Sequence, residues 1–110
     1  MDPNQQPSLA GALDNLWVRF LPEMEGRVAL LEAAAEASKF DRLSAGQQEE
    51  AHAAAHKLAG VLGTFGLTRG TLLARELEIM YSPQNGRDPA QAEQLSQIAT
   101  ELRAIVASRK

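Results

Sequence analysis

The stretch AHKLAGVLGTFG, residues 55–66, decides the fold, because one face of it is apolar and the opposite face carries a histidine. A helix advances by about 100° per residue, so sequence spacing fixes the direction in which each side chain projects. We therefore expect the second half of a helix over 45–65 here, with His56 facing away from the core. Four apolar side chains project within roughly 60° of the side opposite His56: Leu58, Val61, Leu62 and Phe65.

Two glycines, Gly60 and Gly63, project within about 40° of His56 on the same helix. Glycine inside a helix costs about 1 kcal/mol relative to alanine, so each needs a reason to be there. One interpretation is close packing between helices. The interpretation that we favour is clearance for a second protein that approaches the imidazole, because the glycines share the face of the histidine and not that of the core.

Helical apolar patterns recur along the rest of the chain, and no strand pattern occurs. They predict four bundle helices, over 23–38, 45–65, 69–82 and 89–108. Because the connections between them are short, adjacent helices should run antiparallel. The expected fold is all-α: an up-and-down antiparallel four-helix bundle with an additional N-terminal helical segment. We expect a single helical domain over 9–110, preceded by a disordered tail over 1–8.

A few residues predict where the helices begin, bend and end. Ser44 is placed to cap the central helix, Thr68 the next one and Asp88 the last one. Gly66 is placed to end the central helix in a left-handed conformation. Pro22 interrupts the first apolar pattern, and proline inside a helix removes a hydrogen bond. The segment 9–38 is therefore either one kinked helix or two consecutive helices, and we expect a break or bend at Pro22.

The composition excludes several classes of protein. The chain has 110 residues, 45% of them hydrophobic and 23% charged, which suits one globular domain with a modest core. Without cysteine it can form no disulfide and no thiolate metal site. A formal net charge of -3 argues against nucleic acid or an anionic membrane as the main partner, and no apolar run could span a bilayer. The N-terminus lacks a signal sequence, so we expect a cytoplasmic protein.

The run from His56 to Gly66 resembles the phosphorylation-site helix of histidine-containing phosphotransfer (Hpt) domains. That family typically shows His-x-Leu-Lys-Gly followed by a later glycine, and this chain has HKLAG at 56–60 with Gly66 in the later place. The later Leu77-Glu78 pair also matches the family pattern, but weakly. Two positions depart from the pattern: Ala59 stands where the family usually has lysine, and Val61 where a small polar residue is common.

The resemblance implies that His56 is a phosphoacceptor, through its outer nitrogen Nε2. A neutral imidazole is a good nucleophile towards an activated phosphoryl group. The implied partners are the receiver domain of a response regulator, which would bring the aspartate and Mg²⁺, and a hybrid sensor histidine kinase. The chain has no phosphate-binding loop and no kinase-like nucleotide motif, so we expect a relay without bound cofactor and not a kinase.

Residues around His56 are expected to serve the phosphate or the partner. Lys57, Gly60 and His52 form the expected neighbourhood of the phosphate, although a solvated surface role for Lys57 is the stronger interpretation. Gly63 is expected to give the partner clearance, and Thr64 to lie at the docking surface.

The resemblance also implies that the N-terminal helix takes part in docking. It suggests apolar contacts with the partner from Leu13, Trp17 or Leu21. An equally good interpretation of Trp17 is that it caps the core of the bundle.

His52 offers two alternatives to this account. It lies four residues before His56, so the two imidazoles project to one side of the helix and could hold a divalent metal ion, with Glu49 on the same face. The HExxH pattern is absent and two histidines do not complete a zinc site, so we expect no metal. His52 is also the rival phosphoacceptor, disfavoured because the Leu-x-Gly spacing follows His56.

Two other functions stay open at this point. The chain could be a non-catalytic helical adaptor, in which His56 has no chemistry, or a metal-binding bundle that uses His52 and His56. A dimeric phosphotransferase is a further alternative. We expect a monomer, because four predicted helices are enough for a complete bundle.

Overall fold

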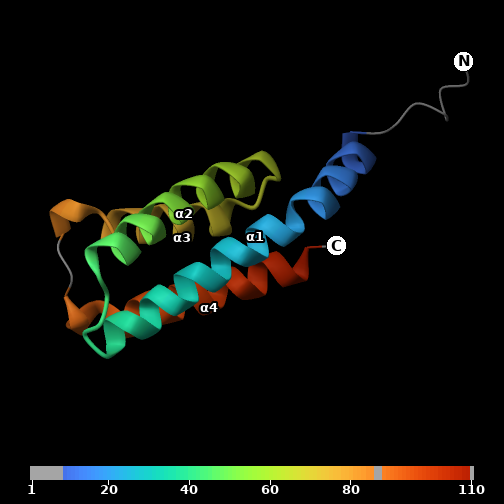
Figure 1. Cartoon of the computed structure of the whole chain (residues 1–110). Coiled ribbons are helices and arrows are strands. Elements are labelled where there is room, and N and C mark those ends of the chain that lie inside the picture. The colour runs from blue at the N-terminus through green and yellow to red at the C-terminus, as the bar shows by residue number, and fades with distance from the viewer. Residues whose placement is uncertain (1–8, 86–87, 110) are drawn as a thin grey trace, which may run out of the picture.

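The computed structural model describes residues 9–85 and 88–109, and this part of the chain is helical (Figure 1). The tail expected over 1–8 lies outside the described residues. The elements follow in the order α1 (Leu9–Lys39), α2 (Ala45–Thr64), α3 (Thr68–Met80), the short 3₁₀ turns η2 (Pro83–Asn85) and η3 (Pro89–Gln91), and α4 (Ala92–Ser108). No strand occurs between Leu9 and Arg109 among the residues described, so the all-α prediction is confirmed.

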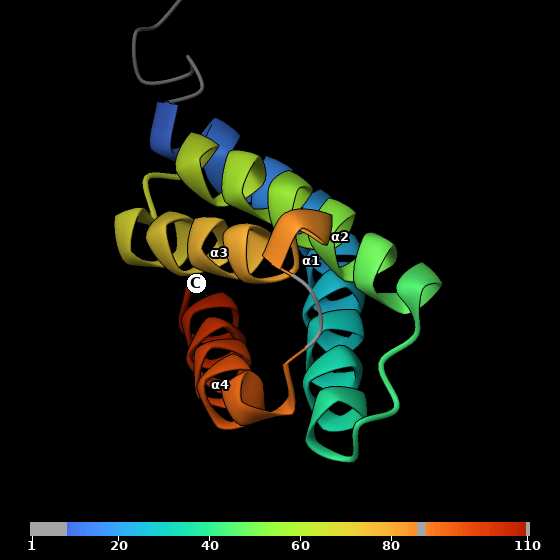
Figure 2. The same ribbon diagram turned by 90° about the vertical axis from the view of Figure 1, so that its left-hand side faces the viewer.

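The four helices form an up-and-down antiparallel bundle, as predicted. Helix α2 packs against α3 and α1 packs against α4, while α1 also contacts α2 and α3 contacts α4 (Figures 1 and 2). The four helices are therefore arranged around the bundle axis in the order α1, α2, α3, α4, and α4 packs back against α1. The first turns of α1 extend past the ends of the other helices (Figure 1).

Helix α1 is one continuous element, so a break at Pro22 is wrong and the single-helix alternative holds. The additional N-terminal segment is the first half of this helix. A proline removes one backbone hydrogen bond, but packing on both sides of it holds the helical path. Trp17 and Met24 are buried before and after Pro22, while Pro22 itself is exposed and needs no partner in the core.

The core lies along the axis of the bundle, and small residues let the helices approach one another. Helix α2 buries a stripe of alanines beside Leu58 and Leu62. On α3 the close approach occurs at Gly70, where an added Cβ would lie 2.9 Å from Leu62 Cδ1 and 3.3 Å from Ile105 Cγ2. The largest side chains with almost no exposed surface are Tyr81, Met24, Leu31, Leu58, Leu62, Leu77, Leu102 and Val28.

Three of the four predicted helix boundaries hold. The Ser44 hydroxyl accepts a hydrogen bond from the backbone N–H of Gln47 at 3.0 Å, and Asp88 caps the turn that leads into α4. Gly66 has a φ of +72°, the left-handed conformation that glycine adopts without strain. The prediction for Thr68 is wrong: it is the first residue of α3, and the preceding Leu67 makes no side-chain cap.

Two polar contacts fix α3 against α2 and so define the surface between them. The buried Gln48 side chain donates to the backbone oxygens of Tyr81 and Ser82, at 3.2 and 3.1 Å, just beyond the end of α3. Thr71 Oγ1 donates to the backbone oxygen of Ala59 at 3.3 Å. Buried polar groups with partners resist displacement, because breaking such a bond leaves a desolvated group unpaired.

Candidate functional site

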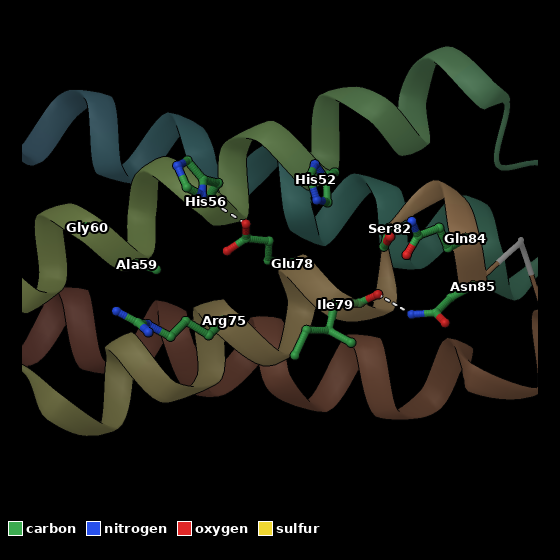
Figure 3. A pocket seen from close by; sticks show the side chains of 10 residues that line it. All are labelled: His52, His56, Ala59, Gly60, Arg75, Glu78, Ile79, Ser82, Gln84 and Asn85. Carbon is green, nitrogen blue, oxygen red and sulfur yellow. Dashed lines mark hydrogen bonds and ion pairs between the residues drawn. The ribbon is translucent and has the colours of Figure 1, made fainter.

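A cleft of about 680 Å³ opens along the outer surface where α2 meets α3 and the η2 turn (Figure 3). Helix α2 places its outward face on one side, and α3 places the side chains of one face on the other. The residues that line it are His52, His56, Ala59, Gly60, Arg75, Glu78, Ile79, Ser82, Gln84 and Asn85. The Asn85 amide donates to the backbone oxygen of Ile79, which holds the η2 turn against the end of α3.

His56 lies at this cleft and faces away from the core, as predicted. Its side chain is 71% exposed, so a second protein can reach the imidazole without any rearrangement of the bundle. The ring is held from the opposite helix: Nδ1 lies 2.8 Å from Oε2 of Glu78 on α3 (Figure 3). Glu78 is more enclosed, with 27% of its side chain exposed.

The contact with Glu78 sets which ring nitrogen is available. An ionised carboxylate can only accept hydrogen bonds, so Nδ1 of a neutral imidazole carries the proton and donates to Glu78. The lone pair then lies on Nε2, which is the other nitrogen of the ring. In the neutral imidazole the contact therefore leaves Nε2 as the nitrogen with an available lone pair, on a side chain that is 71% exposed.

His52 lines the same cleft one helical turn before His56 and is half-buried. Within 9–85 and 88–109, no group of three or more histidine, aspartate or glutamate side chains is arranged to hold a metal ion. Glu78, whose Oε2 lies 2.8 Å from His56 Nδ1, does not complete such a group with the two histidines. His52 is placed as a neighbour of His56.

The remaining neighbours on α2 lie in different surroundings. Lys57 is exposed and is not among the residues that line the cleft. Gly60 lines it and has open space in front of it: an added Cβ would meet nothing within 4 Å. Gly63 faces α3, where an added Cβ would make an ordinary contact of 3.5 Å with Thr71. Thr64 is exposed, and its hydroxyl donates to the backbone oxygen of Gly60 at 3.1 Å.

In the N-terminal half of α1 some apolar side chains are buried in the core and others are exposed at the surface. Trp17 is only 3% exposed and packs edge-on against Phe65, with ring centroids 5.1 Å apart, which agrees with the interpretation that it caps the core. Leu13 and Leu21 are half-buried against that core. Apolar surface on this half of α1 comes from residues that were not predicted to take part in docking: Leu9, Leu16, Val18 and Phe20.

Two charged residues of the cleft were not predicted as site residues. Glu78 was noted only as part of a pattern, and Arg75 was not noted at all. Both come from α3, so only the tertiary packing brings them to His56. A helical projection of α3 could have found that they share one side of it, but not which side faces α2.

His56 is an exposed histidine on a four-helix bundle, its ring is held by a carboxylate of the next helix, and it lies in an open cleft that a second protein can reach. Phosphotransfer needs such an accessible histidine. The comparison with known families agrees: residues 15–108 match the Hpt domain, and the chain belongs to this family. Membership of the family gives the chain a role in two-component phosphotransfer.

A curated relative extends the comparison. Protein RcaC of Microchaete diplosiphon is 33% identical over 99 residues, which cover 90% of this chain and 15% of RcaC. The chain thus spans about 15% of the length of that relative. No solved structure matches the chain significantly. None of the described helices is both long enough and apolar enough to cross a membrane.

Proposed function

We propose that this chain relays a phosphoryl group between receiver-domain aspartates, with His56 as the phosphoacceptor. The observation that carries the proposal is the arrangement at His56: the side chain is 71% exposed, and Nδ1 is held by Glu78 at 2.8 Å, which leaves Nε2 open. Membership of the Hpt family supports the same choice of residue, because the matched range of 15–108 includes the run from His56 to Gly66 that resembles the family's phosphorylation-site helix.

The transfer step follows from this arrangement. The Nε2 lone pair attacks the phosphorus of an aspartyl phosphate and forms a P–N bond, while the bond from phosphorus to the aspartyl oxygen breaks. The electron pair leaves with the aspartyl oxygen and restores the carboxylate. The imidazole becomes positively charged, since Nδ1 keeps its proton, and the Glu78 carboxylate beside Nδ1 stabilises that charge. Transfer to a second aspartate reverses these steps.

The partner is proposed to supply what the chain lacks. A receiver domain would bring the aspartate and hold Mg²⁺, and a hybrid sensor histidine kinase would feed the relay. The proposed docking surface combines the open strip at Gly60 with the exposed side chains on α1, including Leu16 and Phe20. We further propose that the chain acts as a monomer, because its own four helices bury a continuous core.

The experiment is a transfer assay with phosphorylated receiver domains of the source organism and Mg²⁺. It compares the unmodified chain with His56→Gln and with His52→Gln as the matched control. We expect an acid-labile, alkali-stable phosphoryl label that is lost with His56→Gln and kept with His52→Gln. Loss with His52→Gln alone would move the site by one turn. No label from any receiver, with the helical circular dichroism intact, would favour the non-catalytic adaptor.

A further inference from the structure

The cleft beside His56 also contains a cationic side chain, Arg75, which has no role in the transfer step described above. Arg75 lies on α3, one helical turn before Glu78, and its side chain lines the same cleft as His56 and Gly60. Figure 3 shows this side chain extending along α3 beneath Ala59, in the direction away from Ile79. The residue is exposed, so a long side chain there can change its conformation at little cost.

A phosphoryl group bound to His56 would add negative charge to the cleft, and a nearby cation would offset that charge. A phosphoryl group on Nε2 carries up to two negative charges and would share the cleft with the carboxylate of Glu78. The phosphoryl group and Glu78 together carry up to three negative charges, and the imidazolium that forms on phosphorylation offsets one of them, so a further cation in the cleft favours phosphorylation. Among the lining residues that the structure describes, Arg75 has the one side chain that is cationic at every physiological pH.

The other candidates for this task are placed differently. Ala59, on the α2 side of the cleft, offers no charge, and Lys57 does not line the cleft. Four other arginines are engaged in ion pairs elsewhere, namely Arg27, Arg69, Arg103 and Arg109. Within the described ranges, the guanidinium of Arg75 makes no ion pair or hydrogen bond, so it can bind an incoming anion without giving up a partner.

We propose that Arg75 is the phosphoryl-binding residue of this site and that it contacts the phosphoryl oxygens during transfer to and from His56. Its planar guanidinium presents paired N–H donors that match the spacing of two phosphoryl oxygens. The covalent step stays as described for His56, and Arg75 forms and breaks no covalent bond. This inference rests on the proposed function of His56.

The test is single-turnover transfer from a phosphorylated receiver domain with Mg²⁺, measured over a range of concentrations of this chain. The limiting rate constant reports on the phosphoryl transfer, and the half-saturating concentration reports on docking. The variants are Arg75→Ala and Arg75→Lys. Arg42→Ala is the control, since Arg42 is an exposed arginine in the α1–α2 connection and not part of the cleft.

We expect Arg75→Ala to lower the limiting rate constant about tenfold and to change the half-saturating concentration less than twofold. Arg75→Lys should lose less, because it keeps the charge but not the paired donors, and Arg42→Ala should match the unmodified chain. An unchanged limiting rate constant in Arg75→Ala would overturn the inference, as would a change confined to the half-saturating concentration. If the unmodified chain accepts no phosphoryl group at His56, the proposed function itself fails and this inference fails with it.

Discussion

At the scale of single residues, the chemistry depends on the contact between Glu78 and His56. In the proposed mechanism the carboxylate, 2.8 Å from Nδ1, holds the proton there and stabilises the charge that the imidazole gains on phosphorylation. The contact joins residues 22 positions apart in the sequence. It is therefore a product of how α2 and α3 pack.

We predict that Glu78→Ala slows phosphoryl transfer to His56 about fivefold. The loss corresponds to about 1 kcal/mol, less than the roughly 1.5–3 kcal/mol of a hydrogen bond to a charged group, because the imidazole is largely exposed. Transfer kinetics give the rate, and ¹⁵N chemical shifts of the imidazole give the tautomer. Glu78→Gln should lose less, since an amide oxygen still accepts from Nδ1.

The matched control for this change is Glu50→Ala, because Glu50 is an exposed carboxylate on α2 that does not line the cleft. Its transfer rate and its His56 tautomer should equal those of the unmodified chain. An unchanged tautomer and rate in Glu78→Ala would show that the contact with Glu78 has no part in the reaction.

Sequence alone predicted the direction of His56 but not its surroundings. The direction follows from helical spacing within α2, where the apolar residues fix the buried side. Whether Glu78 and Arg75 lie near His56 depends on how α3 is rotated about its own axis. The apolar periodicity of α3 does not fix that rotation closely enough to predict it. A pattern within one helix therefore identified the candidate nucleophile, while the charges around it required the packed structure.

At the scale of secondary structure, the outer face of α2 is shaped by Gly60. An exposed glycine inside a helix reduces stability, and at this position it leaves an open strip beside His56. The glycine that serves helix packing is a different one, Gly70 on α3. Close helix packing requires neither glycine near the histidine, since an added Cβ meets nothing within 4 Å at Gly60 and makes an ordinary contact of 3.5 Å at Gly63.

We predict that Gly60→Gln raises the free energy of unfolding by about 0.5 kcal/mol, because glutamine is the better helix former. The same change should lower the transfer efficiency at least tenfold, since the longer side chain stands where the partner approaches. Urea unfolding measures the first quantity and transfer kinetics the second.

Gly26→Gln is the control for this pair of effects. Gly26 is an exposed glycine inside α1, and an added Cβ there meets nothing within 4 Å. This variant should gain similar stability and keep its transfer efficiency. Full transfer efficiency in Gly60→Gln would refute the role of Gly60 in clearance.

The helices themselves were predicted well, and the differences have local causes. Bounds at Ser44 and Gly66 hold because a cap and a left-handed residue act within a few positions of the chain. Pro22 misled because its local cost was weighed without the packing of Trp17 and Met24 on either side of it. Contacts across the bundle decide whether a helix continues through a proline, and a local sequence pattern does not reveal those contacts.

At the scale of the whole molecule, the end of the chain is tied to the first half of α1. The guanidinium of Arg109 lies 5.0 Å from the ring centroid of Trp17 and 5.2 Å from that of Phe65. It also forms an ion pair with Asp14 at 3.1 Å. These contacts join α1, the end of α2 and the residue after α4, and they hold the part of α1 that carries the proposed docking surface.

We predict that Arg109→Ala lowers the free energy of unfolding by about 1 kcal/mol, the size of a cation–π contact with a partly exposed ion pair. Urea unfolding followed by the fluorescence of the single tryptophan, Trp17, measures the change. Hydrogen exchange should also become faster in the first half of α1.

Arg42→Ala serves as the reference for this measurement, because a surface change of this kind usually alters stability by less than about 0.5 kcal/mol. Equal midpoints for the two variants would show that the contacts of Arg109 do not stabilise the molecule.

The central claim is that Nε2 of His56 carries the phosphoryl group. The most direct measurement is NMR of the phosphorylated chain with ¹⁵N-labelled histidine, in which ¹⁵N–³¹P coupling identifies the nitrogen bonded to phosphorus. The account predicts coupling at Nε2 of His56, with Nδ1 still protonated and with the signals of His52 lacking coupling. Coupling at Nδ1 of His56, or at either nitrogen of His52, would contradict it.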